Sequence, residues 1–158
     1  MANTQSMCTS FMGELLTATH NFGTAPTRGT SAADTFKAAL YLTSATIDAA
    51  TTAYTVSGEV SGAGYSAGGV TVTNANPPTA TNASATAGVA FFTPSASLVY
   101  TSVTLTTAFD AVLIYNSTQS DKAVSVHTFG AQTITAGTFT LTMPANTTST
   151  ALLRLATT

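Results

Sequence analysis

Threonine alternates with large apolar residues along much of this chain, most clearly in the segment TFTLTM at residues 138–143. Successive side chains of a β-strand point to opposite faces, so this pattern gives a strand one apolar face and one face of hydroxyl and methyl groups. Threonine favours strands and leaves such a face without charge. The alternation therefore predicts β-structure wherever it recurs.

Short segments of this kind follow one another from residue 34 onward, with turn residues and no helical pattern between them. The predicted strands are 36–43, 54–60, 70–73, 88–92, 98–107, 109–116, 123–129, 138–143 and 151–155. Turns are predicted around Gly130 and Gly137. Many short strands with brief turns favour antiparallel sheets. We therefore predict a mainly β fold, a single jelly-roll-like antiparallel β-sandwich over residues 34–158.

Residues 5–19 have helical spacing instead. Met7, Phe11 and Leu15 recur every four residues, and Met12 lies beside them, so the segment predicts one short amphipathic helix. A loop rich in glycine and proline follows and ends the first segment, residues 1–33. Two interpretations stay open for this segment. The helix either covers one opening of its own sandwich or reaches a neighbouring subunit as an assembly arm.

Only 6% of the residues are charged, with a formal net charge of −2. About a quarter is usual for soluble domains, which stay apart through interspersed charge. A neutral surface suits packing against other protein, so we expect a subunit of a dense assembly. The candidate interface residues are Met7, Phe11, Met12, Leu15 and Tyr65. Tyr65 lies in the glycine-rich stretch 61–69, whose glycines favour positive φ angles or a conformational change on assembly.

Several partner classes are disfavoured by the composition. Four basic residues are too few for binding nucleic acid through its phosphates, and apolar runs such as 111–115 are too short to span a membrane. Cys8 is the lone cysteine, predicted to be a buried thiol without a disulfide. Two histidines do not suffice for a zinc site. We expect no metal and no cofactor, and the N-terminus lacks the pattern of a secretion signal.

No reaction is indicated by the sequence. The glycine-rich stretch lacks the Lys-Ser/Thr of a phosphate-binding loop, and no G-x-S-x-G motif exposes a nucleophilic serine. We therefore predict that the chain is not an enzyme. A hydrolase remains the alternative from another class, and it would require convergence of the glutamates and histidines Glu14, Glu59, His20 and His127.

Five blocks of the sequence stand out as a set: 5–22, 34–41 (DTFKAALY), 59–69 (EVSGAGYSAGG), 113–117 (LIYNS) and 136–144 (AGTFTLTMP). As a set they resemble small virion proteins of tailed bacteriophages. The resemblance implies a capsid cement, or decoration, protein made in the bacterial cytoplasm. Such a protein would associate with itself as a dimer or trimer and bind the major capsid protein lattice on the capsid surface. The resemblance supplies no catalytic residue. The alternatives within the particle are a head-fibre, tail or adaptor component and a glycan-binding or glycan-hydrolysing protein.

Overall fold

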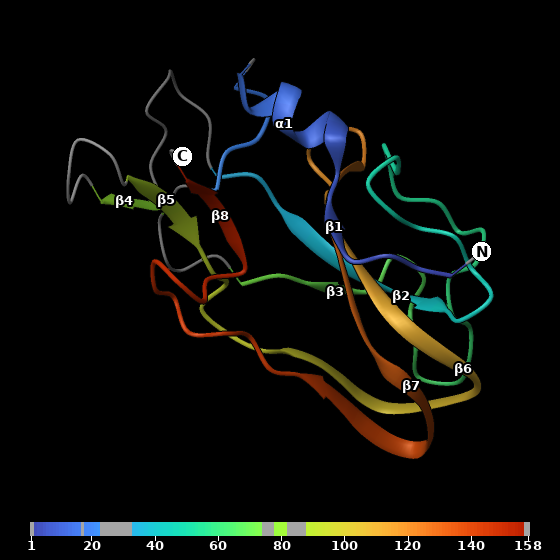
Figure 1. The fold of residues 1–158 in the computed structure, drawn as a ribbon. Coiled ribbons are helices and arrows are strands. Elements are labelled where there is room, and N and C mark those ends of the chain that lie inside the picture. The colour runs from blue at the N-terminus through green and yellow to red at the C-terminus, as the bar shows by residue number, and fades with distance from the viewer. Residues whose placement is uncertain (1, 17, 23–32, 74–77, 82–87, 157–158) are drawn as a thin grey trace. The chain divides into compact units, whose positions relative to one another are not determined.

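The computed structural model describes residues 2–16, 18–22, 33–73, 78–81 and 88–156 (Figure 1). Its two antiparallel sheets and one short helix confirm the predicted mainly β class. The described residues form two compact units, each drawn from three chain segments. The first unit comprises residues from 1–20, 34–72 and 98–140, and the second comprises residues from 21–33, 73–97 and 141–158. Most of the predicted loop, 23–32, lies outside the described residues.

The first unit contains a five-stranded sheet in the order β1-β7-β6-β2-β3 (Figure 1). In chain order these strands are β1 (Ser6–Met7), β2 (Phe36–Leu42), β3 (Val70–Thr71), β6 (Leu98–Asn116) and β7 (Lys122–Leu141). β2 and β6 pair antiparallel from Phe36↔Asn116 to Leu42↔Phe109, with an irregularity after Tyr41. β6 is a central strand, and its apolar run Ala111 to Tyr115 is buried throughout. A strand covered on both faces accounts for this run of consecutive apolar residues.

β6 and β7 are each longer than predicted, because each joins two predicted strands into one. Gly130 and Gly137 lie inside β7, so the turns predicted there are wrong. The chain bends instead of turning. Ser102 in β6 and Ala136 in β7 have φ angles of 54° and 46°, which are left-handed and interrupt a regular strand.

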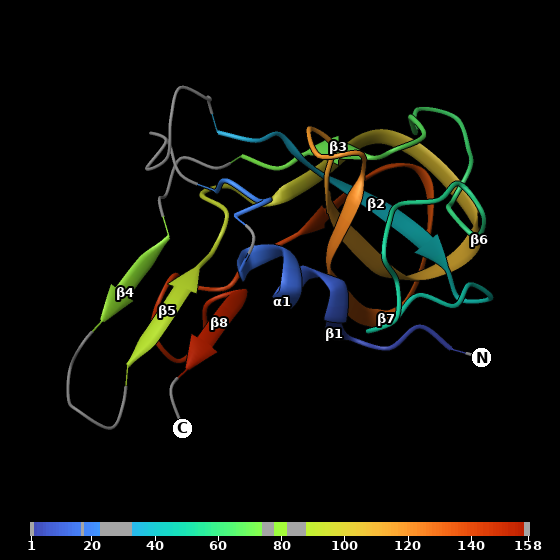
Figure 2. The same cartoon turned by 90° about the horizontal axis from the view of Figure 1, so that it is seen from above.

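The bend in β7 is large. The ring centroids of Phe129 and Phe139 lie 5.3 Å apart, whereas ten residues of straight strand would span about 33 Å. Both rings also contact Phe109 of β6. The two strands therefore curl together around an aromatic cluster, and their curvature is visible in Figure 2. Apolar packing across the curl replaces the turns that the glycines suggested.

The predicted helix is also shorter than expected: α1 spans Thr9–Leu16. Ser6 and Met7 form β1 instead, and pair with Val126 and Ser125 of β7. The open side of β7 offers main-chain hydrogen bonds that outweigh the helical spacing of these two residues. After α1, Ala18 adopts a φ of 54° and the Thr19 N–H donates to the Glu14 carbonyl, which ends the helix.

The prediction of a strand at 54–60 is wrong. That range has one isolated bridge, Tyr41↔Glu59, and a second, Ala53↔Lys122, lies just before it. The Glu59 N–H donates to the Val56 carbonyl across a turn in which Gly58 has a φ of 80°. A glycine that takes this conformation turns the chain where the alternation alone predicts extension.

The second unit contains a three-stranded antiparallel sheet in the order β4-β5-β8. Its strands are β4 (Thr79–Thr81), β5 (Val89–Phe92) and β8 (Leu153–Ala156). β5 is central. It pairs with β4 from Thr79↔Phe91 to Thr81↔Val89 and with β8 from Val89↔Ala156 to Phe92↔Leu153. β4 was not predicted, whereas β5 and β8 occur within two residues of their expected positions.

Candidate assembly interface

The helical stripe nominated by the sequence divides between the core and the surface. Phe11 is 2% exposed, and its ring centroid lies 4.9 Å from that of His20, so it packs inside the first unit. Met7 and Leu15 are half-buried, whereas Met12 is 48% exposed. The Cys8 thiol is buried as predicted, and burial raises its pKa to about 11, which keeps it protonated at neutral pH. Of this stripe, Met12 is the residue most available to a partner.

Tyr65 is tied to its own unit by two hydrogen bonds. Its hydroxyl donates to Glu59 Oε1 at 2.7 Å and accepts the Leu40 N–H at 3.0 Å. Its ring stacks 6.0 Å from that of Tyr100. A pocket of about 150 Å³ beside Tyr65 is also lined by Val99, which is 43% exposed. The hydroxyl end of Tyr65 therefore fixes the loop, while its ring borders a surface hollow.

All five tyrosines of the chain gather around the buried carboxylate of Glu59. Tyr54 donates to Glu59 Oε2 at 2.6 Å, and the Gly68 N–H joins Tyr65 at Oε1 with a distance of 2.7 Å. Tyr115 stacks on Tyr54 with ring centroids 4.7 Å apart. The remaining hydroxyls donate to main-chain carbonyls: Tyr41 to Thr55, Tyr100 to Ala38 and Tyr115 to Gly68. We call this group the Glu59 cluster.

The hydroxyls of the Glu59 cluster stay protonated. Burial first, and then the hydrogen bonds to the Glu59 carboxylate, raise the pKa of Tyr54 and Tyr65 well above its ordinary range. Burial likewise raises the pKa of Tyr41 and of Tyr115 to about 12. Neutral hydroxyl donors thus satisfy a buried carboxylate, which would be costly to bury alone. The cluster fixes the glycine-rich stretch to the sheet.

The glycines of that stretch are required by close approach of the backbone. A Cβ atom on Gly62 would lie 2.0 Å from the Thr104 carbonyl oxygen, and one on Gly69 would lie 1.7 Å from that of Ala38. Gly64, Gly68 and Gly69 have positive φ angles, as predicted. Contact with β6 and β2, rather than space for a phosphate, accounts for the glycine content.

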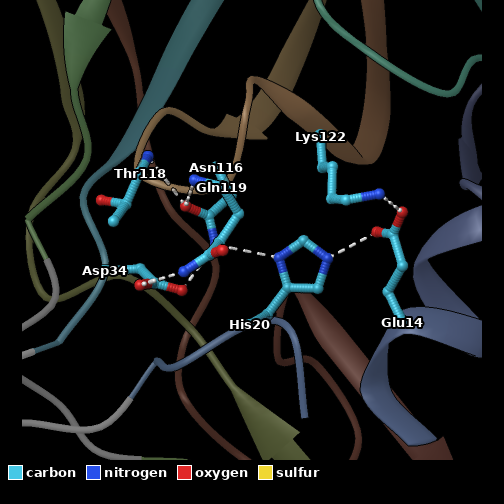
Figure 3. Close-up of polar contacts among 7 residues, drawn as sticks. All are labelled: Glu14, His20, Asp34, Asn116, Thr118, Gln119 and Lys122. Atoms are coloured by element: carbon cyan, nitrogen blue, oxygen red, sulfur yellow. Dashed lines mark hydrogen bonds and ion pairs between the residues drawn. The ribbon is translucent and has the colours of Figure 1, made fainter. Parts of the chain in front are cut away.

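A second polar group, the His20 cluster, joins α1 to the β6–β7 connection (Figure 3). His20 Nε2 lies 2.7 Å from Glu14 Oε2, and Lys122 Nζ lies 2.6 Å from Glu14 Oε1. On the other side, Asn116 Nδ2 contacts His20 Nδ1 at 3.0 Å and Asp34 Oδ2 at 2.7 Å. Side chains from α1, from the segment before β2 and from both long strands are therefore linked through His20 and Glu14.

Asn116 determines which ring nitrogen of His20 carries the proton. The Thr118 and Gln119 N–H groups both donate to Asn116 Oδ1, so Nδ2 is the donor end of the amide. His20 Nδ1 must then accept, which leaves the proton on Nε2, directed at Glu14. The His20 side chain is 0% exposed. With both nitrogens engaged, His20 in this arrangement serves as a structural link and not as a base open to a substrate.

The Glu14 carboxyl is held ionised within the His20 cluster. Burial raises the pKa of Glu14, but the hydrogen bonds from Lys122 and His20 outweigh burial, and the net pKa is lowered. Lys122 is 39% exposed on its side chain and Glu14 is 14% exposed. This ion pair therefore lies partly in water through its lysine.

The two other residues of the hydrolase alternative lie elsewhere. Glu59 accepts hydrogen bonds within the tyrosine cluster, and His127 Nε2 contacts Ser125 Oγ at 2.9 Å. Burial lowers the pKa of His127 to about 4. Among the described residues, no carboxylate is hydrogen-bonded to His127 to complete a Ser-His-acid triad. The structure thus brings Glu14 and His20 together and pairs neither with Glu59 or His127.

No protein-family model, curated protein or solved structure matches this chain.

Most of the few charges are used inside the molecule. Of the nine charged side chains in the described ranges, seven make a side-chain hydrogen bond or ion pair within the chain: Glu14, Asp34, Asp48, Glu59, Asp110, Lys122 and Arg154. Lys37 is half-buried and Asp121 is exposed in a turn. Arg154 is nevertheless exposed and the Lys122 side chain is 39% exposed, so the described surface presents few charges to a partner rather than none.

Two kinds of site are missing from the part of the chain that the structure describes. Within those ranges, no three His, Cys, Asp or Glu side chains gather as metal ligands would. Among the same residues, no helix has the length and apolarity that crossing a bilayer requires.

Proposed function

We propose that this protein is a structural subunit of a tailed-phage particle, which binds the major capsid protein lattice as an oligomer and stabilises the head as a cement protein. The observation that carries the proposal is the scarcity of charge at the surface, because charged side chains are few and most of those described bond within the chain. The phage assignment itself rests on the sequence resemblance.

A cement protein needs rigidity and many weak contacts rather than a reactive centre. The Glu59 and His20 clusters supply rigidity, since they tie the glycine-rich stretch and α1 to the main sheet. Four large apolar side chains are exposed among the described residues: Met12 (48%), Val56 (68%), Val99 (43%) and Leu155 (46%). Each would add a small contact area, and an oligomer that engages several capsid subunits would gain about 10²- to 10⁴-fold in avidity.

Copy number and capsid binding test the proposal. Densitometry of purified particles should find this chain in amounts comparable with the major capsid protein. Added to capsids that lack it, the purified chain should saturate at a fixed ratio and raise the temperature at which the shells disrupt. A few copies per particle would instead assign the chain to a fibre, tail or adaptor.

Salt dependence tests the neutral character of the contact. Binding should weaken by less than about threefold between low and moderate salt, because few exposed charges are available for screening. A matched variant, Ser44→Lys, adds one charge at an exposed turn and should bind similarly if that turn lies outside the contact. A steep loss of wild-type binding with salt would contradict contact through a neutral surface.

A further inference from the structure

We propose that two copies of this chain pair antiparallel through the open edge of β7 at residues 129–133, which extends the five-stranded sheet across a two-fold axis. This inference deepens the proposed function by naming the surface that forms the oligomer. It rests on that function only for the role of the oligomer at the capsid. The pairing itself concerns the purified chain.

The edge is open because β1 covers only its beginning. β1 pairs with Ser125 and Val126, and the Cys8 N–H donates to the Val124 carbonyl at 3.0 Å. Before β1 the chain leaves the edge, since the Thr4 N–H donates to the Ile47 carbonyl. Among the described residues, no strand pairs with the outer side of 129–133.

The main-chain groups that face outward can be identified from β1. Val124 bonds outward to Cys8, and main-chain groups in an antiparallel strand alternate between the two sides, so Gly130 and Gln132 face outward as well. A local bond agrees with this direction: Gln132 Nε2 donates to the Gly130 carbonyl at 3.0 Å. The side chain of Gln132 thus occupies the position that a partner strand's N–H would take.

The chain lacks the usual protection of an exposed edge. Residues 130–133 are all exposed, and no Asp, Glu, Lys or Arg occurs from Ala123 to Leu153. Lysine or proline normally blocks pairing of such edges, and the first proline after this strand is Pro144. The bend at Ala136 limits the straight part to about one ordinary strand length of five or six residues.

A second copy is the occupant that these features favour. Two antiparallel copies of this edge bring no like charges together, whereas a strand from a protein of ordinary composition would carry charges onto a neutral face. The edge already accepts one antiparallel strand, β1, so a second would continue an existing pairing. An edge that pairs with itself makes an isologous contact, which closes at two subunits.

The test measures the molar mass of the full purified chain across concentration, by light scattering or sedimentation equilibrium. We expect a mass twice 15.9 kDa for the wild type. Gln132→Pro removes an outward N–H, Thr133→Lys places a charge at the edge, and both should be monomers. Ser44→Lys carries the same added charge on an exposed turn and should stay a dimer. Thermal melts by circular dichroism confirm that each variant is folded.

Hydrogen exchange keeps the proposal testable if Gln132→Pro fails to fold. In the wild type, the Gly130 and Gln132 amides should exchange more slowly as concentration rises, and in Thr133→Lys they should not. A monomeric wild type, a trimer, or a dimer unaffected by Thr133→Lys would each overturn the pairing. Capsid binding by a monomeric wild type that Thr133→Lys abolishes would also overturn it and assign the edge to a capsid strand. A dimer without capsid binding would leave the pairing intact and defeat the proposed function.

Discussion

The first unit holds two carboxylates, the buried Glu59 and the half-buried Glu14, in opposite ways. Glu59 receives two tyrosine hydroxyls and a main-chain N–H, all neutral donors, and is 9% exposed. Glu14 receives His20 and the ammonium of Lys122, whose side chain is 39% exposed. One cluster holds its carboxylate with neutral donors alone, whereas the other includes an ion pair to a partly exposed lysine, with a buried histidine behind it.

The difference predicts where stability resides. A buried acceptor that is removed leaves its donors without partners and without water, and each such donor costs about 1–3 kcal/mol. A partly exposed ion pair contributes about 0–1 kcal/mol, because water and salt compete for both charges. Burial, rather than charge, should therefore decide which cluster holds the unit together.

The largest effect is expected from Glu59→Ala. It leaves the Tyr54 and Tyr65 hydroxyls and the Gly68 N–H without their acceptor, and should lower the free energy of unfolding by about 3–5 kcal/mol. Urea denaturation measures the loss. Glu59→Gln keeps one acceptor oxygen and should cost clearly less. A loss below about 1 kcal/mol for Glu59→Ala would show that the tyrosines find other acceptors.

Asn116→Ala should rank second. Asn116 is 0% exposed and links four groups, the Thr118 and Gln119 amides, Asp34 and His20. Its loss should cost about 2–4 kcal/mol in the same denaturation experiment. The neighbouring Ser117→Ala, which removes an exposed bond to the Thr35 carbonyl, serves as the control and should cost below about 0.5 kcal/mol.

Mild acid should destabilise the unit through His127, which belongs to neither cluster. Its pKa is about 4 in the fold against an ordinary 6.5, so the unfolded chain takes up a proton first as pH falls. Stability is full above about pH 6.5 and should drop by about 2–3 kcal/mol towards pH 4. His127→Asn should flatten that part of the stability curve. An unchanged slope in the variant would place the acid sensitivity elsewhere.

The smallest effect separates the two carboxylates most directly. The pKa of Glu14 is lowered in the fold, so its contribution is full above its unfolded pKa and is lost as pH falls through the folded value. Lys122→Met should cost about 0.5 kcal/mol at low salt and almost nothing at high salt. The cost of Glu59→Ala should be the same at both salt concentrations. A salt-independent cost for Lys122→Met would show that the pair is effectively buried.

Local alternation predicted most strands but not how they join. The segments 98–107 and 109–116 were each recognised as strands, yet they are one strand, because Ala108 continues the extended chain between them. The break expected at Gly130 is absent, since packing of Phe129 and Phe139 on Phe109 keeps β7 paired through its bend. Side-chain packing across the curl has no signature in short windows of sequence.

The Glu59 and His20 clusters could not be predicted from the sequence either, because their members are far apart along the chain. Asp34 and Asn116 are 82 residues apart, and Tyr115 and Gly68 are 47 apart. No spacing rule links such positions, whereas the helical stripe was visible because its residues are neighbours. Even there the prediction was incomplete, because Phe11 lies in the core while Met12 beside it is exposed.

The sequence by itself determined the β class and the scarcity of charge, because both follow from residue type and short-range alternation. It also predicted positive φ angles among the glycines of the stretch 61–69. Only the tertiary structure decided which carbonyls those glycines approach, which carboxylate the tyrosines surround and which side of β7 stays open. These are contacts between distant segments, fixed by packing and hydrogen-bond satisfaction rather than by local preference.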